Sequence, residues 1–503
     1  MNRLLGIAGT LLCLGIVTAA TAQEWRHWGG DAGGMKFSPA KQIHKGNVDK
    51  LQPAWTWHSG DSSDGSKYPV RSAFEATPLM VGSRLFVTTA FNRLVALDAE
   101  TGKELWAFDP QINKERSYTL FIHRGPAYWT DGKRERVVYG TIDGRLFSID
   151  AATGKPDPAF GESGVVNLRK DTADKFPGRA YGMTSPPAIF ENLAICGAWT
   201  SDGEPKAPSG DIRAFDVLTG KLVWRFHVIP RPGEFGHDTW EGDSWVDRGG
   251  ANAWSILSID QERGMVFLPL TSPSSDYYGG DRPGANLFGD SLVALDARTG
   301  QRKWHFQTVH HNLWDYDLPA QPNLIEVLRD GRKIPAVAQV TKTGFTFVFH
   351  RETGEPLFPV EERKVPPSDV PGEKAWPTQP YPVLPRPFAR QTMMPTELAD
   401  VDPKHRAFCE ELIRDAVFGD LYTPISTRPT VLFPGTNGGT NWGGASFDPE
   451  TQTLYVNSAD AGMISYLREG REGAQLPYNR VGLRTNNARF WDQRLWPCQQ
   501  PPW

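Results

Sequence analysis

The chain lacks the features that mark several large classes of protein. Lys and Arg number 54 against 58 Asp and Glu, so the formal net charge is −4 and there is no basic stripe of the kind that binds nucleic acid. The apolar run from Leu4 to Val17 is too short for a convincing membrane span, and no later segment is long and apolar enough to cross a bilayer. No Cys-x-x-Cys-His motif occurs, so no c-type haem is attached to this chain.

Cysteine is also scarce, with four residues in 503. Cys13 lies in the N-terminal apolar run, which leaves Cys196, Cys409 and Cys498. In an oxidising compartment this odd number permits one disulfide and one buried thiol, and the sequence does not choose the pair. We favour Cys409 with Cys498.

The N-terminus has the pattern of an export signal. Asn2-Arg3 starts it with a positive charge, the apolar run follows, and Ala20-Thr21-Ala22 supplies small residues before Gln23. We predict that residues 1–22 are a signal peptide and that the mature chain is periplasmic. An uncleaved anchor is the alternative, and no other transmembrane segment is expected.

Glycine, proline and aromatic residues are abundant: 50 Gly, 41 Pro, 18 Trp and 26 Phe. This composition suits many short strands and turns better than long helices. With 503 residues, the chain is long enough for a large core.

A hairpin motif recurs along the chain. In it, an alternating apolar strand ends at an Asp that can cap the turn, and a Gly four residues later takes a positive φ. The copies are Val95–Gly102, Phe147–Gly154, Arg213–Gly220 and Val293–Gly300, with a weaker one at Phe347–Gly354 and a degenerate one at Asp448. Three copies carry a Trp eight residues after the Asp: Trp106, Trp224 and Trp304. The repeat predicts an all-β fold, a β-propeller of four-stranded blades, with each Trp wedged between neighbouring sheets.

The repeat spacing indicates a single propeller domain over residues 23–503. A stretch rich in Pro and charge, about 355–414, is expected to be a surface insertion. Propellers close by pairing strands from both chain ends, yet no repeat follows Asp448 before Trp503. Either the ring is small and irregularly closed or the chain is a truncated form, and we favour truncation.

Polar and aromatic residues gather between the repeats, and these segments resemble a known family. In order, they are Phe74–Pro78, His123–Gly125, Thr184–Pro187, Gly236–Trp254, His310–Pro319 and Gly438–Gly444. They are similar to motifs of the pyrroloquinoline-quinone-dependent dehydrogenases (quinoproteins), most closely the glucose and polyol (quinate-like) branch. The resemblance spans roughly residues 25–503. It implies an eight-bladed propeller, whose last one to two blades look absent here, that holds pyrroloquinoline quinone (PQQ) and Ca²⁺.

The resemblance also implies roles for individual residues. Asp315 matches the catalytic base, and a carboxylate in hydrogen-bond reach can take the hydroxyl proton as hydride leaves the carbinol carbon. Lys342 matches the lysine that hydrogen-bonds the quinone oxygens, where an ammonium stabilises developing negative charge. Asn252 and Asp315 match calcium ligands, and Asp202 is the nearest candidate for a further carboxylate. The ion would polarise the quinone carbonyl.

Other residues match cofactor-contacting positions: Glu75, Arg124, Thr184, Trp245, Asn441 and Trp442. Trp245 matches the ring on which the flat cofactor stacks, and Arg124 could pair with a cofactor carboxylate. The alternatives are an Asp315 that only caps a loop, a solvated Lys342 and a core Trp245.

The sequence therefore predicts an enzyme, a quinoprotein dehydrogenase that oxidises a CH–OH group of a small-molecule sugar, polyol or alcohol. The alcohol-oxidising branch carries adjacent cysteines, which this chain lacks, and this favours the glucose and polyol side. The His expected before the Arg-Gly motif of glucose enzymes falls at Leu120, with His123 displaced, which argues against glucose itself. We expect a diffusible electron acceptor such as a cytochrome or quinone. A non-catalytic periplasmic scaffold and an inactive truncated relative are the rival hypotheses.

Overall fold

The computed structural model describes residues 24–398 and 402–483, and nearly all of its regular structure is β-strand. The helices in these residues are α1 (Pro403–Ile413) and the short 3₁₀ helices η1 (Val48–Lys50), η2 (His237–Thr239) and η3 (Pro395–Glu397). Within the same ranges, no helix has the length and apolar character needed to span a bilayer. The expected signal peptide, residues 1–22, lies outside the described residues.

Four antiparallel sheets in the described part of the chain have four strands each. The first contains β1 (Leu79–Val81), β2 (Arg84–Thr88), β3 (Leu94–Asp98) and β4 (Glu104–Phe108). The second contains β5 (Ala127–Thr130), β6 (Glu135–Gly140), β7 (Arg145–Asp150) and β8 (Val165–Asn167). The third contains β10 (Ala188–Phe190), β11 (Leu193–Cys196), β13 (Ile212–Asp216) and β14 (Leu222–Phe226). The fourth contains β15 (Ser258–Asp260), β16 (Met265–Pro269), β17 (Ser291–Asp296) and β18 (Arg302–Gln307).

Smaller sheets make up the remainder. Two have three strands: β19 (Asn323–Arg329), β20 (Arg332–Val340) and β21 (Thr346–His350), and then β24 (Thr430–Leu432), β27 (Met463–Glu469) and β28 (Tyr478–Gly482). Three are pairs: β9 (Tyr181–Gly182) with β12 (Trp199–Thr200), β22 (Val360–Lys364) with β23 (Thr378–Pro382), and β25 (Ala445–Asp448) with β26 (Thr453–Val456).

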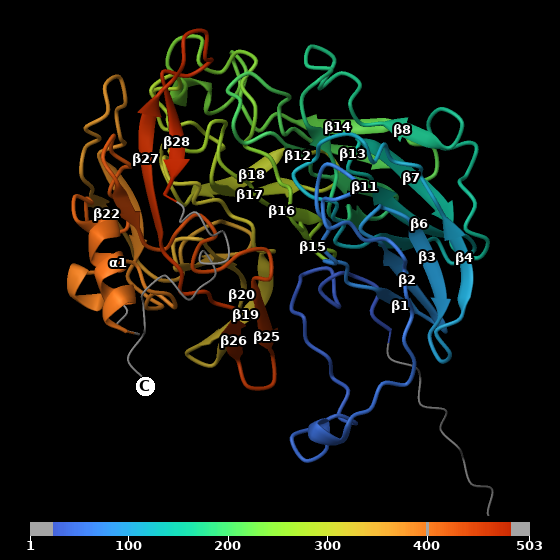
Figure 1. Ribbon diagram of the computed structural model, residues 1–503. Helices are drawn as coiled ribbons and strands as arrows, with labels where there is room; N and C mark the ends of the chain where they lie inside the picture. The colour runs from blue at the N-terminus through green and yellow to red at the C-terminus, as the bar shows by residue number, and fades with distance from the viewer. Residues whose placement is uncertain (1–23, 399–401, 484–503) are drawn as a thin grey trace, which may run out of the picture.

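The sheets are arranged around a common centre. The first strands of successive sheets lie side by side, in the order β5, β10, β15, β19 and β25. Figure 1 shows the sheets following one another from the blue β1–β4 to the red β27 and β28. This is the architecture of a β-propeller, so the predicted fold class is confirmed, while the eight-blade count stays a prediction.

The N-terminal segment, residues 25–35, runs across the inner strands and ties them together. Trp25 exchanges both backbone hydrogen bonds with Met80 of β1. Further along, backbone N–H groups of later sheets donate to its carbonyls: Ile259 to Ala32, Leu324 to Gly33 and Phe447 to Met35. Sheets that are far apart in the sequence are therefore joined through one short extended segment.

The repeated turn has the predicted chemistry. Asp98 Oδ1 accepts hydrogen bonds from the backbone N–H and the hydroxyl of Thr101, at 2.9 and 2.7 Å. The same pair of bonds recurs at Asp150, Asp216 and Asp296, and Thr451 donates to Asp448 in the degenerate copy. The glycines that follow have φ between +69° and +75°: Gly102, Gly154, Gly220, Gly300 and Gly354.

The predicted tryptophan wedge is also confirmed. Trp106 Nε1 donates to the carbonyl of Ala151 in the next sheet at 3.2 Å, and a Cβ on Gly154 would lie 2.6 Å from the ring. Two further rings make the same contacts one sheet onward: Trp224 with Ala297 and Gly300, and Trp304 with Arg351 and Gly354. Trp55, which the spacing rule missed, packs in this way on Gly102.

The excursion expected at about 355–414 contains the β22–β23 hairpin and α1. Gln379 of β23 is buried and bonded to the backbone of His310, so the hairpin supports a loop near the centre. Cys409 of α1 is buried, as is Cys196, and the two are not bonded to each other. The pairing predicted for Cys409 involves Cys498, which lies outside the described residues.

Candidate active site

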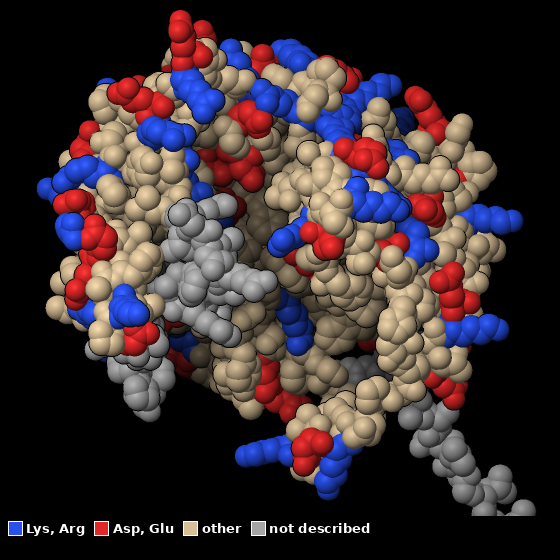
Figure 2. All heavy atoms as spheres, in the orientation of Figure 1, with Lys and Arg blue, Asp and Glu red and all other residues tan. Residues whose placement is uncertain are grey.

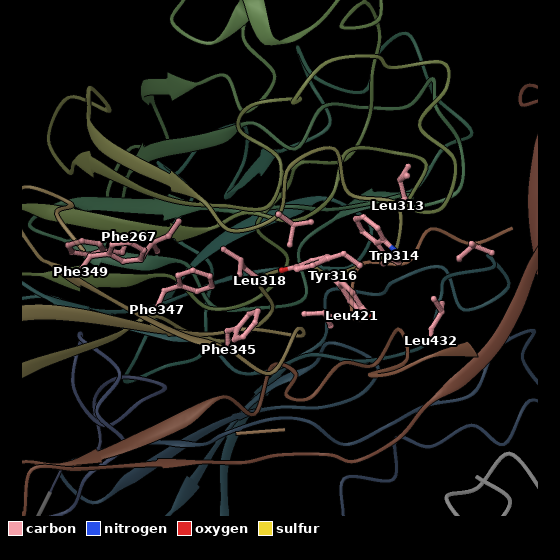
Figure 3. Packing of buried hydrophobic residues seen from close by; sticks show 14 of the residues in the cluster. Phe267, Leu313, Trp314, Tyr316, Leu318, Phe345, Phe347, Phe349, Leu421 and Leu432 are labelled. Carbon is pink, nitrogen blue, oxygen red and sulfur yellow. The ribbon is translucent and has the colours of Figure 1, made fainter. Parts of the chain in front are cut away.

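Asp315 is held between two anchored aromatic residues. The rings of Trp314 and Tyr316 are buried and stack 6.0 Å apart, within the hydrophobic cluster of Figure 3. Trp314 Nε1 donates to the Thr423 carbonyl, and the Tyr316 hydroxyl donates to the Pro434 carbonyl, both at 2.8 Å. With both neighbours fixed in the core, the backbone of Asp315 takes a φ of +60° and its carboxylate projects among polar side chains.

The Asp315 carboxylate meets a buried lysine. Lys342 Nζ donates to Asp315 Oδ1 and to the Asp315 carbonyl, both at 2.8 Å, and to Asp317 Oδ2 at 3.3 Å. The Lys342 side chain is 5% exposed and that of Asp315 is 20% exposed. A Cβ on Gly438 would lie 2.5 Å from the Lys342 side chain, and Gly439 N–H donates to the Lys342 carbonyl at 2.7 Å. Glycine is needed in this loop because the backbone passes directly against the lysine.

The protonation of this pair follows from its surroundings. Burial alone would lower the pKa of Lys342, but the carboxylates of Asp315 and Asp317 outweigh it and raise that pKa, so the amine stays charged. Burial raises the pKa of Asp315 to about 7, against the opposing effect of the lysine. A carboxyl group with a pKa near neutrality is suited to accept and release a proton.

Two more carboxylates lie near this pair. Burial, together with repulsion from Asp315 and Asp317, raises the pKa of Asp202 to about 7. The Asp202 side chain nevertheless retains exposed surface. Figure 2 shows that one face of the molecule is hollowed near its centre. Asp276 is 8% exposed, and burial and the neighbouring aspartates raise its pKa well above the usual range. Four carboxylates thus share one ammonium, an excess of negative charge that a cation would relieve.

A second charged group is centred on Arg124. Its Nη2 lies 2.8 Å from Glu75 Oε2 and its Nη1 donates to Thr184 Oγ1 at 3.1 Å. The guanidinium carbon lies 4.8 Å from the ring centre of Trp254 and 5.2 Å from that of Trp442. Burial lowers the pKa of Arg124 to about 10, with Glu75 acting in the opposite direction. Arg124 Nε is buried and has no hydrogen-bond partner among the described residues.

Trp254 joins the two groups. Its indole Nε1 donates to Asp317 Oδ2 at 3.4 Å, while its ring faces Arg124. Trp245, the ring predicted from the sequence, packs edge-on against His237 with 5.3 Å between ring centres and lines a different groove. The structure brings Trp254, and not Trp245, against Arg124 and Asp317.

The predicted calcium ligand Asn252 is engaged inside the protein. It is 1% exposed, and its Oδ1 accepts from the hydroxyls of Thr200 and Thr271 at 3.1 and 3.0 Å. Its Nδ2 donates to the Ala198 carbonyl at 2.8 Å. Both ends of the amide therefore stabilise the fold, and this arrangement offers no free oxygen from Asn252.

The side chain of Asn441 is likewise hydrogen-bonded within its own loop. Its Nδ2 donates to the Asn437 carbonyl at 3.0 Å, and its Oδ1 accepts from Trp442 N–H at 2.8 Å. The side chain fixes the turn that presents the Trp442 ring to Arg124. Asn441 therefore contributes to the site through its neighbour.

The structure brings most of the predicted residues together: Glu75, Arg124, Thr184 and Trp442 in one group, and Asp202, Asp315 and Lys342 in the other. Sequence reasoning missed Asp317, Trp254, Asp276 and Tyr277. Asp317 and Trp254 stand in the polar, aromatic segments already singled out, and the sequence alone does not show which of the neighbouring acids and rings contact Lys342 and Arg124.

This site belongs to a known family. A sequence profile described as "PQQ: Glucose/ethanol/alcohol dehydrogenase, beta-propeller domain" matches residues 25–503. The chain is therefore a member of the PQQ-dependent glucose/alcohol dehydrogenase family.

Three curated relatives give the comparison more detail. The quinate/shikimate dehydrogenase (quinone) of Acinetobacter baylyi is 33% identical over 95% of this chain and 63% of its own length. The glycerol dehydrogenase large subunit of Gluconobacter oxydans is 34% identical, over 95% and 68%. The quinoprotein glucose dehydrogenase of Escherichia coli is 33% identical, over 97% and 64%. The chain thus spans about two thirds of the length of these relatives.

Solved structures agree on the fold. A quinohemoprotein alcohol dehydrogenase from Comamonas testosteroni has a TM-score of 0.67 at 24% identity, covering 90% of this chain and 60% of that one. A europium-containing methanol dehydrogenase has a TM-score of 0.69 at 20% identity, covering 93% and 74%.

Proposed function

We propose that this chain is a quinoprotein dehydrogenase that oxidises a CH–OH group of a sugar, polyol or alcohol, with PQQ as hydride acceptor and with calcium assistance. The observation that carries the proposal is a series of contacts. Lys342 donates hydrogen bonds to Asp315 and Asp317. Trp254 donates to Asp317, and its ring faces Arg124. In support of the proposal, these contacts join a buried carboxylate, an ammonium, an aromatic face and an incompletely bonded guanidinium. The relatives named as quinate, glycerol and glucose dehydrogenases support this substrate class.

The residues present fit a flat, acidic quinone. A cofactor carboxylate would complete the hydrogen bonding of Arg124, whose buried Nε lacks a partner in the described part of the chain. The ring of Trp254 offers a planar apolar surface between Arg124 and the acidic group. When bound, the quinone supplies a two-electron acceptor for the hydride from the carbinol carbon.

Calcium fits the surplus of carboxylates. Ca²⁺ takes six to eight oxygen ligands. In the described residues, no group of three or more His, Cys, Asp or Glu side chains is already arranged to hold a metal ion, so the carboxylates would have to close around it. We propose that Asp315 and Asp202 supply carboxylate oxygens and that Asp276 takes the place first predicted for Asn252. Other oxygens, including those of the cofactor, would complete the set.

Each residue has a separate role in the proposed reaction. Asp315 accepts the proton of the substrate hydroxyl as the carbon–hydrogen electron pair leaves as hydride, which gives a carbonyl product. Lys342 stays protonated, orients the carboxylate through its 2.8 Å hydrogen bond and stabilises negative charge developing beside it. Asp317 holds the same ammonium from the other side, at 3.3 Å.

The proposal is tested with the purified chain, PQQ and calcium. Reduction of an artificial electron-accepting dye is measured with a panel of aldoses, polyols and primary alcohols. Turnover that a chelator abolishes and excess calcium restores is the expected result. Tight cofactor binding without turnover would instead favour an inactive relative, and no binding at all would favour a non-catalytic scaffold.

We further propose that the chain is exported, with residues 1–22 removed, and that it passes electrons to a diffusible acceptor such as a cytochrome or quinone. Cell fractionation combined with N-terminal sequencing of the mature chain tests the location. A full-length N-terminus retained in the membrane fraction would support the uncleaved anchor instead.

A further inference from the structure

A tyrosine from a neighbouring loop contacts the Asp315 carboxylate directly. The Tyr277 hydroxyl donates to Asp315 Oδ2 at 3.2 Å, on the oxygen that Lys342 does not use. One end of this ring therefore lies at the reacting group.

An arginine covers the face of the same ring. The guanidinium carbon of Arg480, on β28, lies 4.6 Å from the centre of the Tyr277 ring. Arg480 Nε donates to the Ser465 hydroxyl at 3.1 Å, and its Nη2 contacts the Met463 sulfur. In the described part of the chain these are the side-chain contacts of Arg480, and no Asp or Glu forms an ion pair with it. Its charge is thus matched by a hydroxyl, a thioether and an aromatic face.

This arrangement is unusual for a half-buried arginine. The planar guanidinium presents a fork of N–H donors that matches a carboxylate, and such groups are usually paired with one when they leave bulk water. A neutral sugar or polyol has no need of a full positive charge beside the base. A substrate carboxylate would complete the hydrogen bonding of Arg480, and the guanidinium would offset the repulsion between that carboxylate and the surrounding aspartates.

We propose that Arg480 binds a carboxylate of the substrate, so that the substrate is a polyhydroxy carboxylic acid whose oxidised hydroxyl lies at Asp315. Tyr277 lies between Asp315 and Arg480: its hydroxyl positions the base, and its ring supports the guanidinium. The inference rests on the proposed function and adds the class of substrate to it.

The first test needs no variant. Gluconate and glucitol have the same number of carbons and differ in one terminal carboxylate, so they serve as the charged and neutral probes. Their binding to the full chain is measured by calorimetry before and after PQQ and calcium are added. We expect gluconate to bind roughly 10- to 100-fold more tightly, the range for a charge-assisted bidentate hydrogen bond. Equal binding of the two probes would overturn the proposal.

A pair of variants locates the effect. Arg480→Met removes the charge but keeps an unbranched side chain over Tyr277, and the exposed Arg468 of β27, changed in the same way, is the matched control. In the loaded enzyme, R480M should raise KM for gluconate roughly 10- to 100-fold with kcat little changed, because binding of substrate and transition state is lost equally. R468M should change neither constant.

The two proposals can fail separately. If the loaded chain oxidises glucitol and gluconate with the same kcat/KM and R480M alters neither, the dehydrogenase stands and the carboxylate site does not. If no compound reduces the dye, the proposed function fails, while calorimetry of the wild type and of R480M with gluconate still decides the role of Arg480. Should R480M be poorly folded, equal binding of the two probes to the wild type would still overturn the proposal.

Discussion

Lys342 and Asp315 form a buried charged pair in the candidate active site, with Nζ and Oδ1 2.8 Å apart. Lys342 follows β20, a strand of the sheet β19–β21, whereas Asp315 lies in the loop that connects β18 of the preceding sheet to β19. The pair therefore forms only when this connecting loop is correctly packed against the β19–β21 sheet. The same ammonium also binds the Asp315 carbonyl, so it fixes both the backbone and the side chain of the candidate base.

The first prediction concerns that base. Asp315→Asn keeps the size of the side chain and its acceptor for Lys342 but removes the group that takes up the proton. With calcium and PQQ at saturating concentrations, we expect kcat to fall by about 10² to 10⁴, the usual contribution of a general base. Dye-reduction kinetics measure the loss, and the same change at the exposed Asp243 is the control. A D315N enzyme with unreduced kcat would show that proton transfer occurs elsewhere.

The second prediction distinguishes the two tryptophans. Trp254→Ala removes the ring that faces Arg124 and the indole that donates to Asp317, so PQQ affinity should fall roughly 10- to 100-fold. Trp245→Ala, outside this contact network, should leave the affinity within about twofold. Equilibrium titration of tryptophan fluorescence with PQQ measures both. The reverse result would restore the role first given to Trp245.

The sequence predicted most reliably those features that depend on local chemistry. The Asp-x-x-Thr-Gly turn forms within five residues, so each copy could be recognised without knowing the rest of the fold, and the eight-residue spacing predicted the wedge of Trp106. Trp55 was missed because no copy of the turn precedes it at the eight-residue spacing.

The candidate site was predicted less completely because long-range contacts decide which side chains are free. Asn252 has the chemistry of a calcium ligand, but Thr200 and Thr271, both distant in sequence, use its oxygen. The choice between Trp245 and Trp254 depended on the path of the loop between them, which composition does not reveal.

The third prediction tests the wedge through a glycine pair. Gly354 and Gly331 have φ of +75° and +74°, so alanine is strained at both, by about 1–2 kcal/mol. A Cβ at Gly354 would also lie 2.5 Å from the ring of Trp304, whereas nothing lies within 4 Å of one at Gly331. Gly354→Ala should therefore destabilise the protein by about 1–3 kcal/mol more than Gly331→Ala, because the buried ring must shift. Urea denaturation measures the free energy of unfolding of both variants. Equal losses would show that the Trp304 ring moves aside without an energetic cost.

The last prediction concerns pH and a histidine beside the Arg124 group. His123 is 1% exposed, its Nε2 lies 2.8 Å from the Gly140 carbonyl, and its Nδ1 accepts from Gly125 N–H. Burial is the main cause that lowers the pKa of His123 to about 4, and the nearby Arg124 acts in the same direction. The folded protein therefore holds a neutral imidazole, whereas the unfolded chain binds a proton below about pH 6.5. Stability from this group is present above that pH and is lost as pH falls toward 4.

Between pH 7 and pH 5 the loss from His123 should be about 2 kcal/mol, measured by urea denaturation at each pH. His123→Gln keeps an amide donor and acceptor but cannot titrate. From pH 7 to pH 5 the free energy of unfolding of H123Q should therefore fall by about 2 kcal/mol less than that of the wild type. His305, whose pKa burial also lowers to about 4, contributes the same slope to both proteins and cancels in the comparison. His44→Gln, at an exposed position, should behave as the wild type. If H123Q and the wild type lose stability in parallel, the acid sensitivity of the fold arises from other groups.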